Sequence, residues 1–123
     1  MTRVLRSKGQ ATFRQRVLAA YGYRCCVTGE ATVEVLDASH IQPYVNKESD
    51  HIQNGLALRA DFHRLFDAGL ITVDDDYRVV LGDHLESVTY ASYEGRQILM
   101  PHEPANKPSR EVLKVHRALV YRA

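Results

Sequence analysis

The sequence predicts one α+β domain, with two strands and the following helix at its centre, flanking N- and C-terminal helices, and an additional β-hairpin. Three observations predict it. Apolar residues recur at helical spacing in three places, short β-branched runs lie between them, and glycine, proline or aspartate separates the runs. A chain of 123 residues that is 45% hydrophobic and 25% charged is ordinary for a globular protein with one core.

The first half of the chain predicts a helix, two strands and a long loop between the strands. The helix follows from an apolar stripe of four residues: Phe13, Val17, Ala20 and Tyr21. Gly22 is expected to end it. A strand is expected over 33–39, a loop rich in turn-forming residues over 41–53, and a second short strand over 55–59.

The next segment predicts an amphipathic helix. Asp61 is expected to cap it, and the helix should run to about Ala68 and be closed by Gly69. Its buried stripe has i, i+3, i+4 spacing: Phe62, Leu65 and Phe66.

The last third of the chain predicts a hairpin, a strand and a terminal helix. Apolar runs at 70–73 and 77–81 flank three consecutive aspartates, which is typical of a β-hairpin. A further strand is expected over 96–100, and Ser109 is expected to cap the last helix. Four residues of that helix are expected to face inward: Val112, Val115, Leu119 and Val120.

Charge is distributed unevenly, although the net charge is only +1. Residues 1–29 hold six basic residues and no acid, residues 30–103 hold fourteen acids and five bases, and residues 104–123 hold five bases and one acid. This suits a protein that binds phosphates at its edges and a cation at its centre, but solvated helix faces and acidic turns explain it equally well.

The domain organisation follows from composition. We expect a basic arm at 1–9 and a single domain at 10–123, with its core unit at about 33–68. The N-terminal segment lacks the apolar stretch of a secretory signal, and no apolar run is long enough to span a bilayer, so the cytoplasm is the expected compartment. The adjacent Cys25 and Cys26 are interpreted as free thiols, because a bridge between neighbours is strained and a zinc site needs further ligands.

Two histidines and two carboxylates in this core unit are typical of phosphodiester hydrolysis. That reaction needs an activated water and a cation that neutralises the phosphoryl oxygens. His40, at the end of a predicted strand, has a side chain whose unperturbed pKa suits a general base. His63 and Asp67 lie four residues apart on the predicted helix and can present two ligands to one ion. Asp37 could reach the same ion from the strand.

The runs 35–44 and 54–67 resemble the signature of the HNH endonucleases, and the spacing from His40 to Asn54 to His63 fits that pattern. The resemblance is clear over about residues 10–82, and the tail at 99–122 is similar to restriction-type members. It implies a ββα-metal finger in which His40 is the catalytic base and Asn54 holds the histidine loop by hydrogen bonds. His63 would then bind one divalent cation.

The sequence departs from the family pattern at Ser39, where many members carry an acid or a histidine. A serine hydroxyl is a poor metal ligand, so Asp37, on the same strand face, is the expected replacement. Asp67 matches a position that often carries a second ligand on the helix. The expected metal ligands are thus His63, Asp37 and Asp67. Mg²⁺ is the expected ion, although mixed nitrogen and oxygen ligands also suit Mn²⁺, Ni²⁺ and Zn²⁺.

The leading hypothesis is a metal-dependent DNA endonuclease of the restriction kind, with Arg59 and Arg64 on the flanking phosphates. DNA specificity would come from a recognition domain fused to this chain or acting as its partner. One alternative is a catalytically weak or inactive HNH-fold module that only binds DNA. A second alternative is a structural or partner-interaction domain whose histidines are incidental. The sequence predicts neither the oligomeric state nor the choice between a nick and a double-strand break.

Overall fold

The centre of the fold is a two-stranded antiparallel sheet and the helix that follows it. A computed structural model describes residues 12–123, so the basic arm predicted at 1–9 lies outside the described residues. Strand β1 (Leu36–His40) pairs with β2 (Gly55–Arg59) in a register that sets His40 opposite Gly55. Helix α2 (Ala60–Asp67) follows β2 without a loop. The expected mixture of helices and strands in one small domain is confirmed.

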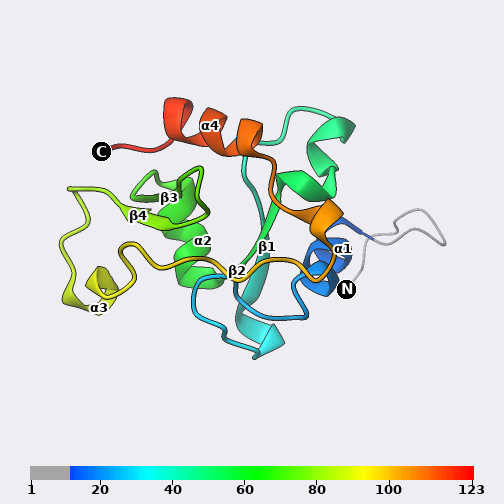
Figure 1. Cartoon of the computed structure of the whole chain (residues 1–123), viewed down its shortest axis with the longest axis horizontal. Coiled ribbons are helices and arrows are strands. Elements are labelled where there is room, and N and C mark those ends of the chain that lie inside the picture. The colour runs from blue at the N-terminus through cyan, green and yellow to red at the C-terminus, as the bar shows by residue number, and fades with distance from the viewer. Residues whose placement is uncertain (1–11) are drawn as a thin grey trace, which may run out of the picture.

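Helix α1 (Phe13–Ala20) and α2 both pack on this sheet, which lies between them (Figure 1). A capping box starts α1, because the Thr12 side chain accepts a hydrogen bond from the Gln15 amide and the Gln15 side chain accepts one from the Thr12 amide. Gly55 permits the close approach of α1 to β2. A Cβ atom there would collide with Val17 and lie 3.1 Å from Phe13.

A second sheet and the last helix complete the core. Strands β3 (Ile71–Val73) and β4 (Val79–Leu81) are antiparallel, and α4 (Arg110–Leu119) packs against β3. Figure 1 shows α4 along one side of the molecule, above β3 and β4. Helix α3 (Val88–Ala91) and, within the described part of the chain, four 3₁₀ turns occupy the connections: η1 (Val33–Val35), η2 (Lys47–Asp50), η3 (Ile52–Asn54) and η4 (Pro104–Asn106).

The prediction of a strand over 33–39 is wrong for residues 33–35. Residues 33–35 form η1, and pairing begins at Leu36 and extends to His40. The pairing starts only at Leu36 because the partner strand β2 has five residues and its last, Arg59, lies opposite Leu36. Val33 and Val35 are exposed, so their β-branched side chains do not pack in the core.

Two further expectations about local structure are wrong. Residues 96–100 do not form a strand, because their only ladder contact with another residue of 12–123 is a single bridge between Gln97 and Arg78. Asp61 does not cap α2, which starts one residue earlier at Ala60. Asp61 instead lies in the first turn and bonds the guanidinium of Arg59 through both carboxylate oxygens, at 2.7 and 2.9 Å.

The predicted inward face of α4 is out of phase with the observed one. Ser109 caps the helix as expected, by accepting hydrogen bonds from the Glu111 and Val112 amides. The buried residues are Leu113 and His116, however, and Leu119 is 77% exposed. An apolar stripe could not reveal this, because the central inward residue is a polar histidine whose ring nitrogens are hydrogen-bonded.

One hydrophobic core joins the two sheets and the helices. Phe62 and Phe66 of α2 are the largest fully buried side chains among residues 12–123, as the helical stripe predicts. Cys25 and Cys26 are both buried, and both are free. Within residues 12–123, none of the helices has the length and apolarity needed to cross a membrane.

Candidate active site

His40 ends β1, and its imidazole is held on several sides. The Nε2 atom lies 2.8 Å from Oδ1 of Asp50 in the loop after β1. The ring of Phe13, from α1, stacks on the imidazole with centroids 4.0 Å apart and planes within 2°. Tyr44 contacts the imidazole edge-on at 5.6 Å. The imidazole is thus fixed by residues from α1 and the loop, not by the strand alone.

His63, on α2, lies between two carboxylates. Its Nδ1 is 2.9 Å from Oδ2 of Asp37 on β1, and its Nε2 is 3.1 Å from Oδ2 of Asp67, one helical turn later. Helical geometry places residues four apart on one face, and strand alternation turns Asp37 toward α2. The three side chains that were expected to bind a metal are therefore brought together.

The two carboxylates change the protonation of His63. The hydrogen bond to Asp67 and then the one to Asp37 raise the pKa of His63 to about 9, against the opposing effect of burial. A carboxylate can only accept hydrogen bonds, so both ring nitrogens donate and the imidazole is a cation at neutral pH. We call His63, Asp37 and Asp67 the cationic cluster, because the two carboxylates stabilise a positive charge on the histidine.

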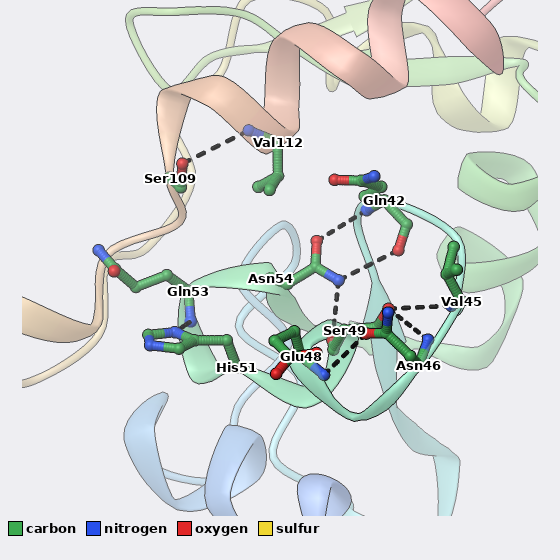
Figure 2. A pocket seen from close by; sticks show the side chains of 10 residues that line it. All are labelled: Gln42, Val45, Asn46, Glu48, Ser49, His51, Gln53, Asn54, Ser109 and Val112. Carbon is green, nitrogen blue, oxygen red and sulfur yellow. Dashed lines mark hydrogen bonds between the residues drawn. The ribbon is translucent and has the colours of Figure 1, made fainter.

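Asn54 holds the loop that follows His40. Its side chain is buried, and Oδ1 accepts from the Gln42 amide at 2.8 Å while Nδ2 donates to the carbonyls of Gln42 at 3.1 Å and Ser49 at 2.9 Å. Figure 2 shows the carboxamide between these two segments of the loop. A backbone hydrogen bond from Ile41 to the Asn54 carbonyl, 2.9 Å long, continues the pairing of β1 and β2. The loop ends are thus tied together at the base of the sheet.

His40 and His63 line the same cavity, which has a volume of about 350 Å³. Asp67 and Tyr44 also line it, and so does His116 of α4. A larger cavity of about 450 Å³ lies beside the 41–54 loop and α4 and contains neither His40 nor His63 (Figure 2). Of these two cavities, only the one of about 350 Å³ is lined by a candidate base together with His63 and Asp67.

Comparison with known families assigns the central segment. The family described as HNH endonuclease matches residues 25–74, which contain His40, Asn54 and His63. The chain is similar to the HNH endonucleases over this segment. No curated protein matches the chain significantly.

A solved structure shares the fold of this chain. A protein titled "Modification dependent TagI restriction endonuclease" superposes with a TM-score of 0.62 at 23% sequence identity. The match covers 88% of this chain and 37% of that protein, so the chain spans a little over a third of the length of its neighbour.

The donor types of the HNH cluster fit a divalent cation, although its geometry is not that of a preformed site. Among residues 12–123, no three or more His, Cys, Asp or Glu side chains are arranged to hold a metal ion. Asp37 and Asp67 contact different ring nitrogens of His63, which point away from each other. An ion would take the place of one of the two N–H protons, so His63 would bind it together with one of the carboxylates.

The buried Ser39 is not a ligand candidate in this HNH site. It is fully buried, and its hydroxyl donates to the His40 carbonyl at 3.4 Å. Asp37 is the residue of β1 whose carboxylate contacts His63.

The two arginines expected to contact phosphate, Arg59 and Arg64, differ in whether another side chain already binds the guanidinium. Arg59 is engaged by Asp61, and this pairing raises the pKa of the guanidinium and lowers the pKa of Asp61 to about 2. Arg59 also lies four residues along β2 from Gly55, the partner of His40, which is about 13 Å at strand spacing. Arg64 is exposed, and its guanidinium has no ion pair or hydrogen bond to another residue of 12–123.

Sequence reasoning missed four residues around the HNH histidines. Asp50 and Phe13 contact His40 directly, and Tyr44 and His116 line its cavity. Phe13 was identified only as part of a helical stripe, and His116 was not predicted to face inward. Asp50 lies ten residues after His40 in an irregular loop, where no periodicity signals a contact.

Proposed function

We propose that this chain hydrolyses DNA phosphodiester bonds with the help of a divalent metal ion, and that His40 is the general base. One observation carries the proposal: His40 and His63 line one cavity of about 350 Å³, which is large enough for a phosphate group and an ion. The match of residues 25–74 to the HNH endonuclease family supports it.

His40 would remove one proton from a water molecule, and the resulting hydroxide oxygen would bond to phosphorus in line with the leaving oxygen. The 3′ oxygen would then depart and take a proton from solvent. Asn54 would contribute by fixing the loop after His40, through its bonds to Gln42 and Ser49. Positioning of this kind is a large part of catalysis in phosphoryl transfer.

His63 would bind the ion together with Asp37 or Asp67, because these side chains are already in contact. When bound, a divalent ion neutralises charge on a non-bridging oxygen and on the leaving oxygen. The nitrogen and oxygen donors suit Mg²⁺, and also Mn²⁺, Ni²⁺ or Zn²⁺. Metal binding must displace a proton from His63, so it should be favoured by higher pH.

DNA is the proposed substrate, with Arg64 and Arg59 on the flanking phosphates. The chain spans 37% of the structural neighbour, a modification-dependent restriction endonuclease by title. We therefore propose that sequence or modification specificity belongs to another domain or partner.

A second candidate function is a DNA-binding HNH module that does not cut. It is favoured by the cluster itself, in which both nitrogens of His63 are hydrogen-bonded to carboxylates instead of forming a preformed metal site. Buried Ser39 also stands where many family members carry a ligand.

A nicking assay on supercoiled plasmid separates the two functions. Methylated and unmethylated plasmid would be incubated with the wild-type chain and Mg²⁺, Mn²⁺, Ni²⁺ or Zn²⁺, and binding would be followed by gel shift. His40→Ala should reduce nicking by about 10²–10⁴-fold, the usual contribution of a general base, without loss of DNA binding. His84→Ala is the matched control, because His84 is exposed and lines neither cavity.

Undiminished nicking by His40→Ala would refute the catalytic assignment. Binding without nicking by the wild-type chain, under every ion and on both plasmids, would favour the non-cutting module. A chain that neither binds DNA nor shifts its melting temperature with any ion would refute both.

A further inference from the structure

The side chain of Asp50 is a direct partner of the proposed base, and the geometry decides which nitrogen of His40 carries the proton. Nε2 of His40 lies 2.8 Å from Oδ1 of Asp50. An ionised carboxylate has no proton to donate, so the nitrogen must be the donor. His40 therefore has the Nε2–H tautomer when it is neutral.

The other ring nitrogen, Nδ1, has no hydrogen-bond partner among residues 12–123. Phe13 covers one face of the imidazole in a parallel stack, so the ring cannot turn over without breaking that contact. With Nε2 occupied and the ring fixed, Nδ1 is the nitrogen left to accept a proton from water.

We propose that Asp50 is the positioning residue of the general base, which holds His40 with Nε2–H toward the carboxylate and Nδ1 free for water. The inference rests on the proposed function. When Nδ1 takes the proton of water, the imidazolium keeps its Nε2–H bond to Asp50, and the carboxylate stabilises the new positive charge.

Asp50 is itself held in place, which distinguishes the contact from a chance surface pair. Its backbone carbonyl accepts a hydrogen bond of 2.6 Å from Nη2 of Arg16 on α1. The preceding carbonyl, of Ser49, accepts from the buried Asn54 side chain at 2.9 Å. The helix that supplies Phe13 and the asparagine that ties the loop therefore both locate the Asp50 backbone.

The position of Asp50 predicts an effect on catalysis with little effect on folding. The side chain of Asp50 is 39% exposed and that of His40 27% exposed, and partly exposed ion pairs contribute little to stability. A substitution there should therefore leave the melting temperature nearly unchanged. Loss of the correct tautomer should slow the chemical step instead.

The test compares Asp50→Asn, Asp50→Glu and the matched control Glu48→Gln, whose exposed carboxylate lies two residues earlier in the same loop. Asp50→Asn should lower kcat for plasmid nicking at least about tenfold and change KM less than twofold. Asp50→Glu should recover part of that loss, and Glu48→Gln should behave as wild type. The ¹⁵N spectrum of the metal-free wild type should report a neutral His40 protonated at Nε2, whereas Asp50→Asn should mix the two tautomers.

Each outcome decides the inference. Nicking by Asp50→Asn at the wild-type rate, while His40→Ala is inactive, would overturn the role of Asp50 and leave the proposed function standing. A wild-type His40 protonated at Nδ1, or a tautomer unchanged in Asp50→Asn, would also overturn it. Activity retained by His40→Ala would instead refute the proposed function, and the spectra of the metal-free chain would still decide whether Asp50 sets the tautomer.

Discussion

Asn54 is hydrogen-bonded to both backbone groups of Gln42: Oδ1 accepts from the amide at 2.8 Å and Nδ2 donates to the carbonyl at 3.1 Å. These residues lie at the two ends of the loop between β1 and β2, and Nδ2 also reaches the Ser49 carbonyl. A single buried carboxamide thus fixes three backbone groups, and only a side chain with both a donor and an acceptor can do so.

Replacing Asn54 by Asp should destabilise the loop that carries Asp50 and follows His40. A carboxylate can still accept from the Gln42 amide but cannot donate to the carbonyls of Gln42 and Ser49. We expect a loss of about 1–3 kcal/mol in the free energy of unfolding, together with a lower nicking rate. Urea unfolding and the plasmid assay measure the two effects. Lys47→Ala, in the exposed part of the loop, is the control, and equal stability of Asn54→Asp and wild type would contradict the tether.

Replacing Asp67 by Asn should lower the pKa of His63 from about 9 toward its ordinary value, because the hydrogen bond to Asp67 is the largest cause of the rise. A histidine whose pKa is raised by folding stabilises the fold fully below about pH 6.5. That contribution is lost as pH rises through about 9. An NMR titration of metal-free protein gives the midpoint, with Asp76→Asn in the exposed turn as control. An unchanged midpoint in Asp67→Asn would show that this contact does not form.

The buried His116 should make the protein less stable in mild acid. Burial lowers the pKa of His116, and its ring donates from Nε2 to the Phe66 carbonyl at 2.9 Å and accepts at Nδ1 from the Thr72 hydroxyl at 2.8 Å. The unfolded chain therefore binds a proton that the native chain resists, so stability should fall as pH drops below about 6.5. Urea unfolding at two pH values, one on each side of that point, measures the slope.

Thr72→Val tests the same contact at constant pH, because it keeps the side-chain shape and removes the hydroxyl donor to His116. We expect a loss of about 1–3 kcal/mol in unfolding free energy at neutral pH. His102→Ala is the control, since His102 is exposed. An unchanged unfolding free energy in Thr72→Val would mean that the buried Nδ1 of His116 finds another donor.

Arg64→Ala should weaken DNA binding and reduce the slope of log affinity against log salt by about one phosphate contact. The effect should exceed that of Arg59→Ala, because Arg59 is held by Asp61 and Arg64 has no ion pair among residues 12–123. Fluorescence anisotropy on a short duplex at several salt concentrations measures the slope. Arg78→Ala, which alters the β4 side of the fold, should leave the slope unchanged, and a larger effect of Arg59→Ala would reverse the ranking.

Local patterns determined much of the fold. The stripes at Phe13 and Phe62, the glycine that ends α2 and the serine that caps α4 are short-range features, and each was placed within a residue or two. They are predictable because helix periodicity and end-capping depend on neighbours within one or two turns. The spacing of His40, Asn54 and His63 also lies within one continuous segment, and it was sufficient to indicate the family.

Tertiary packing decided which side chains meet, and the sequence by itself could not. Phe13, on helix α1, reaches His40 on strand β1 because Gly55 leaves room for it. His116 turns inward because α2 and β3 offer an acceptor and a donor. Those partners lie 27 to 50 residues apart in the sequence, so no local period relates them. The sequence thus determined the chemical groups and their supporting elements, whereas the folded chain determined the hydrogen bonds that orient them, since these depend on distances that only packing fixes.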